Sequence, residues 1–301
     1  RQLDVEVEEK DPTDSIRTSI PVTNPLPRAL SATELPLTPA AYGWQLAVES
    51  GVFRSPDQMD AAALAIASLQ RLYDQLHSLP DVDALSDVRI LVENQSRLFF
   101  HGAGGSGKTY CTVKVIIPVL VYFASPAGFK ALAANNGAAR LLGGGTLHSA
   151  MSANRNQSFR AKDLKPGSAT FARLYKMRGT IVGMLIDEIS MASPELLQAV
   201  SLRASYGRRD IRKLDMRKFT EEPFGLVALV ILMGDFLQLN PVKAHTLIEA
   251  YATSTVPGVP REQQRNFRDG IQIFKLFTDV VLFTGEHRFE KGDPLPCLLK
   301  I

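Results

Sequence analysis

The sequence predicts an α/β fold in which a parallel β-sheet carries helices on both faces. Three observations support this prediction: apolar strand-like runs alternate with helix-like segments, two of these runs end in acidic residues, and a glycine-rich loop joins a strand to a helix. Strands of a parallel sheet are buried on both faces and are therefore continuous apolar runs rather than alternating ones. Each element can then be placed by where its apolar run begins and ends.

The first clear helix is predicted to begin at Ser55, in the stretch SPDQMDAAALAIASLQRLYDQL. Ser55 suits the N-cap and Pro56 the first helical position, and apolar residues then recur at helical spacing. Residues 1 to about 39 mix acidic residues with several prolines and show no steady period. We therefore expect a partly irregular flanking segment over 1–54 and one domain over 55–301.

The elements that follow alternate between strand and helix. A glycine-rich turn is expected at 143–145, and the polar and basic residues 152–168 are expected on the surface. Strands are expected at RLFF, FKALAA, IVGMLIDEIS, GLVALVILMGDF and DVVLFT, and helices at CTVKVIIPVLVYF, SPELLQAVSLRA and EQQRNFRDGIQIFKLF.

The glycine-rich loop is the most specific motif in the chain. FFHGAGGSGKTY, residues 99–110, fits the pattern G-x-x-x-x-G-K-[ST] of a P-loop, in which backbone N–H groups and a helix N-terminus point at a phosphate chain. Lys108 would bind the β- and γ-phosphates, and the Thr109 hydroxyl would hold Mg²⁺. The predicted cofactor-binding residues of this loop are Gly102, Gly104, Gly105, Ser106, Gly107, Lys108 and Thr109.

Two adjacent acids, Asp187 and Glu188, end the strand IVGMLIDEIS. Two carboxylates at such a position are costly to bury unless a cation accompanies them. In a P-loop site, the first acid binds Mg²⁺ and its neighbour activates water, so Asp187 is the predicted metal residue and Glu188 the predicted general base. The alternative is a solvated pair at a strand-to-helix turn.

Further candidates follow two other strands. Asp235 and Gln238 end GLVALVILMGDFLQL, where a glutamine can sense the γ-phosphate and orient the attacking water. The alternative is a helix-capping turn, with Asp235 as the cap and Gln238 as its reciprocal partner. Arg288 follows the last strand, where a guanidinium can stabilise transition-state charge, although a lone arginine is more often a surface residue.

The order of these motifs resembles that of the PIF-family (petite integration frequency) DNA helicases, including the helicase part of Helitron-type transposons. The matching segments are GAGGSGKT, AARLLGGGTLHS, LIDEISM, PFG with GDFLQLNPV, and FTGEHR, between about Ser55 and Arg288. This resemblance implies superfamily 1B and the first RecA-like motor domain, with ATP and Mg²⁺ as cofactors. It also implies that the second motor domain is absent from this stretch.

The resemblance also implies roles for individual residues. Arg288 is similar to the arginine finger and Gln238 to the γ-phosphate sensor, while Gln58 is similar to the adenine-reading glutamine that precedes the P-loop in this family. The predicted DNA-binding residues are Thr146, His148 and Ser149 in the segment TLHS. The glycines before them, residues 143–145, would let a backbone approach another chain closely, and hydroxyl and imidazole groups can bond phosphate oxygens.

Two departures from the family pattern affect the DNA-contact and sensor segments. Asn135 and Asn136 stand where the family usually has Thr-Gly, and Asn240 stands where QLPPV has its first proline.

Net charge and composition limit the classes of binding partner but do not identify one. The 301 residues carry a net charge of +3, and two cysteines are too few for a disulfide framework. The apolar run over 115–124 is too short to span a bilayer, so no membrane association is expected. The basic run over 203–218 is either a phosphate-contacting surface or, as we favour, a solvated helix face with Asp210 and Asp215 interleaved.

The function these motifs favour is an ATP-dependent DNA helicase that moves 5′ to 3′ along single-stranded DNA. Family resemblance implies roles in DNA repair, recombination and telomere maintenance, in the nucleus or the mitochondrion. One alternative is a decayed transposon-derived module that binds ATP and DNA without turnover. A P-loop phosphotransferase is the other, and it would require an acceptor pocket for a small molecule.

Overall fold

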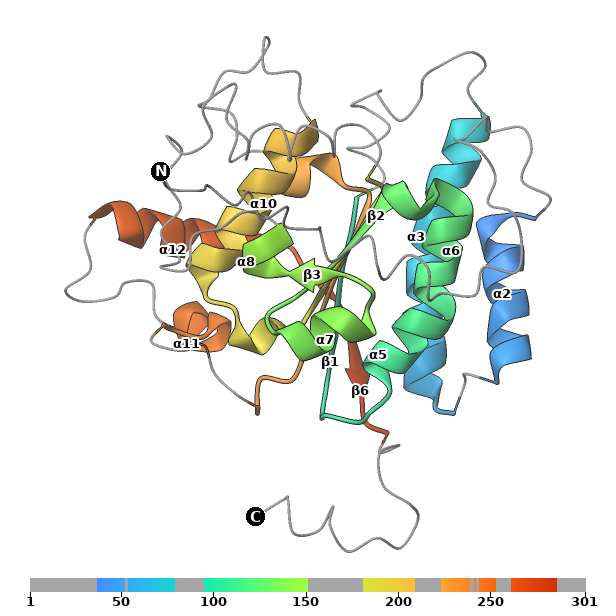
Figure 1. Cartoon of the computed structure of the whole chain (residues 1–301), viewed down its shortest axis with the longest axis horizontal. Coiled ribbons are helices and arrows are strands. Elements are labelled where there is room, and N and C mark those ends of the chain that lie inside the picture. The colour runs from blue at the N-terminus through green and yellow to red at the C-terminus, as the bar shows by residue number, and fades with distance from the viewer. Residues whose placement is uncertain are drawn as a thin grey trace, which may run out of the picture.

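The computed structural model describes residues 37–51, 54–78, 95–150, 181–208, 223–238, 241, 244–252 and 261–285. These residues form an α/β unit in which one central sheet is flanked by helices (Figure 1). The strands are β1 Ser96–Gly102, β2 Phe129–Ala133, β3 Gly145–Thr146, β4 Gly183–Asp187, β5 Leu229–Gly234 and β6 Asp279–Phe283. The longer helices are α2 Pro39–Ser50, α3 Pro56–His77, α6 Ile117–Ala124, α10 Pro194–Arg208 and α12 Arg261–Phe274.

The described residues contain a six-stranded sheet with the order β3-β2-β4-β5-β1-β6. Every pairing between neighbouring strands of this sheet is parallel, as in the register that sets Phe99 of β1 opposite Leu232 of β5. The predicted parallel sheet is therefore confirmed. The carboxyl ends of β1, β4 and β5 lie at the same edge, which is where the loops with the predicted catalytic residues begin.

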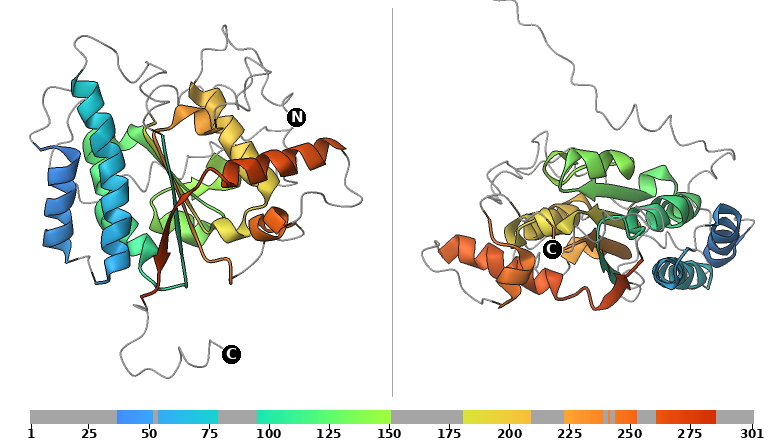
Figure 2. Two further views of the ribbon diagram at one scale, coloured as in Figure 1. Left: turned by 180° about the vertical axis from the view of Figure 1, so that it is seen from behind. Right: turned by 90° about the horizontal axis from the view of Figure 1, so that it is seen from below.

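Helices cover both faces of this sheet, as predicted. In Figures 1 and 2, α2, α3 and α6 lie on one side of the strands, and α10 and α12 lie on the other. The side chains of β1 alternate between these layers because successive residues of a strand point to opposite faces. Leu98 and Phe100 belong to the core that contains α3 and α6, whereas Phe99 belongs to the core that contains α10.

Helix α2 lies within residues 1–54, which the sequence assigns to a flanking segment. The Thr38 hydroxyl caps the helix by accepting a hydrogen bond from the amide of Ala41, at 3.2 Å. Tyr42 stacks on Tyr122 of α6 with 4.1 Å between ring centroids. Helix α2 is thus part of the folded domain, which begins earlier along the chain than the first predicted helix.

The helix after the P-loop is continuous but not uniform. It consists of α5 Lys108–Cys111, the π-helical segment η2 Thr112–Ile116 and α6. The amide of Ile117 donates to the carbonyl of Thr112, five residues earlier, directly before Pro118, which has no amide hydrogen to offer. Within the described part of the chain, no helix combines the length and apolar character that a membrane span requires.

Shorter elements complete the described chain. They are η3 Pro126–Gly128, α7 Asn136–Leu141, α8 Leu147–Ala150, η5 Ile189–Met191, η8 Pro223–Leu226 and α11 Leu247–Ala252.

Gly225, in η8, is expected to tolerate replacement by alanine less well than Gly51 does. Gly225 and Gly51 have similar backbone conformations, with φ of +61° and +56°, so alanine is strained by about 1 kcal/mol at either position. At Gly225 the added Cβ would also lie 2.6 Å from Cα of Ser205, whereas at Gly51 it meets nothing within 4 Å.

We therefore expect Gly225→Ala to lower the free energy of unfolding by about 2 kcal/mol more than Gly51→Ala does, through overpacking against α10. Urea denaturation of both variants measures this difference. Equal losses of stability in the two variants would show that the contact with Ser205 relaxes without cost.

Candidate functional site

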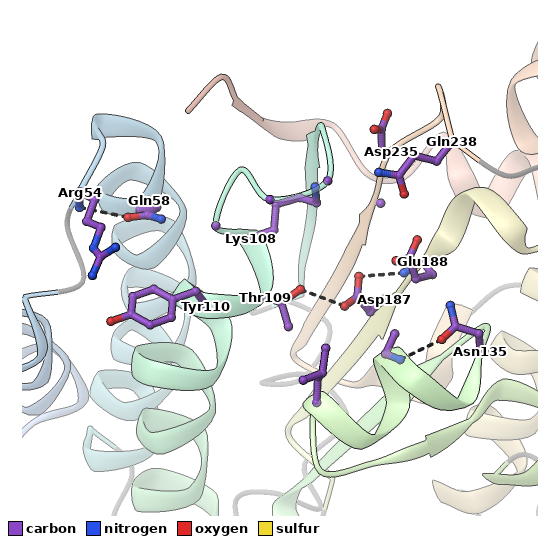
Figure 3. A pocket seen from close by; sticks show the side chains of 16 residues that line it. Arg54, Gln58, Lys108, Thr109, Tyr110, Asn135, Asp187, Glu188, Asp235 and Gln238 are labelled. Carbon is purple, nitrogen blue, oxygen red and sulfur yellow. Dashed lines mark hydrogen bonds between the residues drawn. The ribbon is translucent and has the colours of Figure 1, made fainter. Parts of the chain in front are cut away.

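A cavity of about 460 Å³ opens at the carboxyl edge of the sheet. The loops after β1, β4 and β5 line it, together with the first turn of α3 and helix α7 (Figure 3). It therefore collects residues from five separate parts of the chain. The lining residues are Arg54, Gln58, Gly104, Gly105, Gly107, Lys108, Thr109, Tyr110, Asn135, Ala138, Leu141, Asp187, Glu188, Gly234, Asp235 and Gln238.

The P-loop fixes the position of Lys108 through its own backbone. The Lys108 ammonium donates hydrogen bonds to the carbonyls of Gly102 and Ala103 and to the Ser106 hydroxyl, the last two at 3.0 and 3.3 Å. Gly107, with φ of +92°, precedes α5 in a conformation that favours glycine. Gly102 and Ser106, which were predicted to bind the cofactor, do not line the cavity. They accept hydrogen bonds from Lys108 and so hold this residue in place.

Three carboxylates act electrostatically on the Lys108 ammonium. Burial lowers the pKa of Lys108, while Asp187, Asp235 and Glu188 oppose this effect. Lys108 is only 8% exposed. A buried cation with several acidic neighbours in a cavity is typical of a functional site.

Asp187 is the centre of a small hydrogen-bond network at the end of β4. Its Oδ2 accepts a hydrogen bond from the Thr109 hydroxyl at 3.2 Å, and its Oδ1 accepts one from the amide of Glu188 at 2.8 Å. Burial raises the pKa of Asp187, and these two bonds together with Lys108 work in the opposite direction. The network links the P-loop to the strand that provides the acidic pair.

Glu188 has a left-handed backbone conformation, with φ of +55° and ψ of +42°. Only a few per cent of residues other than glycine have positive φ, and such residues cluster at functional sites. The Glu188 side chain lines the cavity next to Asp187 (Figure 3). The acidic pair is therefore in the cavity and is not a solvated turn.

Asp235 and Gln238 belong to a turn after β5. The Asp235 carboxylate accepts a hydrogen bond from the amide of Leu237 at 2.9 Å, and the Asp235 carbonyl accepts one from the amide of Gln238 at 3.1 Å. Residues 236–238 form this turn, and residues 239 and 240, on which the capping alternative also depends, lie outside the described part of the chain. Gln238 lines the cavity across from Lys108 (Figure 3).

The opposite end of the cavity is formed by Gln58, Arg54 and Tyr110 (Figure 3). Oε1 of Gln58 accepts a hydrogen bond from the amide of Arg54 at 3.1 Å. The Arg54 guanidinium lies over the Tyr110 ring, 5.7 Å from its centroid. Sequence reasoning found Gln58 but missed Arg54 and Tyr110, although Tyr110 directly follows the P-loop threonine.

Asn135 also lines the cavity, at the N-terminus of α7. Its Oδ1 accepts a hydrogen bond from the amide of Ala138 at 2.8 Å, so it acts as the N-cap. Asparagine caps helices at least as well as threonine does. The departure from the family's Thr-Gly therefore preserves the start of this helix.

The predicted DNA-binding residues lie outside the cavity, on β3 and α8. Ser149 is exposed, while Thr146 and His148 are half-buried. Thr146 Oγ1 accepts a hydrogen bond from the amide of Ser149 at 3.2 Å, and burial lowers the pKa of His148. A Cβ on Gly144 would lie 2.0 Å from the carbonyl oxygen of Ala131, so the close approach that this glycine allows is to β2 of the same chain.

Some predictions fall on residues outside the described part of the chain. These include Arg288, Asn240, the surface excursion 152–168 and most of the basic run. Arg203, the first residue of that run, is described and is 3% exposed, so at this position neither a DNA-contacting surface nor a solvated face is correct.

Comparison with known proteins places these motifs in a family. Residues 83–256 match the family model described as PIF1-like helicase. A curated relative, the ATP-dependent DNA helicase PIF6 of Trypanosoma brucei brucei, is 32% identical over 159 residues, which is 50% of this chain and 17% of that protein. The chain thus spans about a sixth of the length of this relative.

Solved structures of Pif1 helicases are similar at lower identity. The Candida albicans enzyme is 24% identical with a TM-score of 0.47, over 72% of this chain and 42% of that one. The Bacteroides enzyme in complex with ADP-AlF3 and single-stranded DNA is 23% identical with a TM-score of 0.41, over 74% of this chain and 46% of that one.

The family match covers more than half of the 301 residues, and it confirms the resemblance drawn from the order of the motifs. The chain belongs to the PIF1-like helicase family.

Proposed function

We propose that this chain is the ATP-hydrolysing part of a DNA helicase that uses ATP to move along single-stranded DNA. The observation that carries the proposal is that Lys108, Asp187, Glu188 and Gln238, from three different strand ends, line one cavity. A nucleoside triphosphate would lie with its phosphates on the P-loop and its base toward Gln58.

The chain's own residues supply the groups that hydrolysis requires. Lys108 would bind the β- and γ-phosphates, and Gln238 would orient the attacking water. Glu188 would accept the proton of that water, and its backbone amide donates a hydrogen bond to the neighbouring Asp187 carboxylate. The predicted contribution of Arg288 is stabilisation of the charge that develops on the phosphate oxygens.

The oxygen groups in the cavity suit Mg²⁺. The Thr109 hydroxyl and the Asp187 carboxylate lie 3.2 Å apart, and both are oxygen ligands of the kind that Mg²⁺ prefers. Among the described residues, no group of three or more His, Cys, Asp or Glu side chains could hold a metal ion by itself. This fits Mg²⁺, which usually takes one or two protein oxygens together with phosphate oxygens and water, and which neutralises phosphate charge when bound.

Single-stranded DNA is the proposed partner. Thr146, His148 and Ser149 lie on the β3–α8 segment, away from the cavity, so both ligands could bind at once. Burial lowers the pKa of His148, and either ring nitrogen that carries a hydrogen could donate to a phosphate oxygen. Movement from 5′ to 3′, roles in repair, recombination and telomere maintenance, and a nuclear or mitochondrial location are proposed from family membership.

The test is ATP hydrolysis by the full-length protein with and without single-stranded DNA. We expect an oligothymidylate to raise kcat by at least about tenfold, since DNA binding and turnover are coupled in a motor. Blunt duplex DNA of equal length is the control. A rate that single-stranded DNA leaves unchanged would contradict the proposal, as would transfer of phosphate to a small molecule instead of water.

A further inference from the structure

Asp57 joins two parts of the chain that are 227 residues apart in sequence. Its Oδ2 accepts hydrogen bonds from the amide of Thr284 at 2.6 Å and from the Thr284 hydroxyl at 3.0 Å. Asp57 lies in the first turn of α3, and Thr284 directly follows β6. One carboxylate oxygen therefore ties the start of a helix to the end of an edge strand.

These bonds involve the ionised carboxylate. The pKa of Asp57 is lowered, above all by the hydrogen bond from the Thr284 amide, so Asp57 is an anion at neutral pH. Hydrogen bonds to an ionised acceptor are shorter and stronger than bonds between neutral groups.

Gln58, which follows Asp57, has two further anchors. Its carbonyl accepts a hydrogen bond from the Cys111 thiol of α5 at 3.3 Å, and its Oε1 accepts one from the amide of Arg54. The first turn of α3 is thus held to the P-loop helix on one side. Through Asp57 it is held to β6 on the other.

Strand β6 in turn pairs with β1, the strand that leads into the P-loop, with Phe283 opposite Gly102. The position of Gln58 relative to the phosphate-binding loop is therefore fixed by contacts on both of its sides. Asp57 itself does not line the cavity, whereas Gln58 does. Asp57 would therefore act on a ligand there through the residues that it holds in place.

We propose that Asp57 is a positioning residue for nucleobase recognition: by tying α3 to the end of β6, it holds Gln58 where the base of the nucleotide lies. This inference rests on the proposed function, because it assumes that the cavity binds ATP. It concerns the base alone, since the phosphates are bound by the P-loop.

The experiment compares two ligands that differ by the nucleoside. In the full-length protein, ATP hydrolysis gives KM and kcat for ATP, and inorganic tripolyphosphate is titrated as a competitive inhibitor to give its Ki. For Asp57→Ala we expect KM for ATP to rise about tenfold, while kcat and the Ki of tripolyphosphate stay within about twofold of the parent values.

Four further variants, one of them a double variant, sharpen the comparison. Asp60→Ala removes an exposed acid from the same helix and should leave all three constants unchanged. Gln58→Ala should raise KM for ATP, and adding Asp57→Ala to it should raise KM little further, because both changes remove the same interaction. Thr284→Val keeps the hydrogen bond from the amide to Asp57 and removes the one from the hydroxyl, so it should raise KM for ATP by a smaller factor. This variant tests the inference even if Asp57→Ala does not fold.

The outcomes separate the inference from the function on which it rests. A parallel rise in KM for ATP and Ki for tripolyphosphate would mean that Asp57 supports the P-loop as a whole, and the inference would be wrong. Additive effects of the Asp57 and Gln58 changes would also overturn it. A parent protein that binds neither compound would overturn the proposed function itself.

Discussion

Lys108→Ala is expected to lower kcat for ATP hydrolysis by about a hundredfold to a thousandfold. Its ammonium is the buried cation of the cavity, and removal of one preorganised donor to a developing negative charge has effects of this size. The change also removes the hydrogen bonds that the ammonium donates to the P-loop. The measurement is steady-state release of phosphate with single-stranded DNA present.

Lys114→Ala is the matched control, because Lys114 is an exposed lysine six residues further along the same helical segment. It removes the same charge and should leave kcat unchanged. Circular dichroism checks that both variants are folded. If Lys108→Ala kept DNA-stimulated hydrolysis at the parent rate, the phosphate-binding role of the P-loop would have to be abandoned.

Glu188→Gln is expected to separate ATP binding from ATP hydrolysis. Glutamine preserves the size and shape of the side chain but cannot accept a proton from water, and general-base catalysis contributes about 10²–10⁴ to the rate. Because the hydrogen bonds that fix the Lys108 ammonium go to Gly102, Ala103 and Ser106 of the P-loop, the Kd for ATP should change by less than about threefold. Single-turnover hydrolysis and equilibrium titration with ATP measure the two quantities.

Glu195→Gln provides the comparison for this prediction, since Glu195 lies in the first turn of α10 and outside the cavity. It should hydrolyse ATP at the parent rate. Loss of ATP binding in Glu188→Gln, or hydrolysis near the parent rate, would assign the general-base role to another residue.

The sequence was sufficient for the elements whose signal is local. Each expected strand from RLFF to DVVLFT is present, and for β4 and β5 the reason is burial, because a buried parallel strand is a continuous apolar run. Gln238 and Glu188 could be placed in one site for the same reason: each follows such a run, and parallel strands end at one edge.

The features that were missed depend on contacts between distant segments. Helix α2 contains Gly43, and a glycine inside a helix weakens the sequence signal. In the structure a Cβ at Gly43 would lie 2.5 Å from Cδ1 of Ile66, so the glycine allows α2 to approach α3 closely. Arg54 and Tyr110 were missed because they become neighbours only when the start of α3 packs beside the P-loop helix.

The left-handed backbone at Glu188 has a consequence for how this domain could be engineered or could evolve. Glycine, and to a smaller degree asparagine, adopt that conformation with less strain than glutamate, so replacement there would make the fold more robust to heat. Selection for thermostability alone would thus tend to discard the predicted general base. A glutamate at this strained backbone position is what a trade-off between stability and catalytic activity would produce.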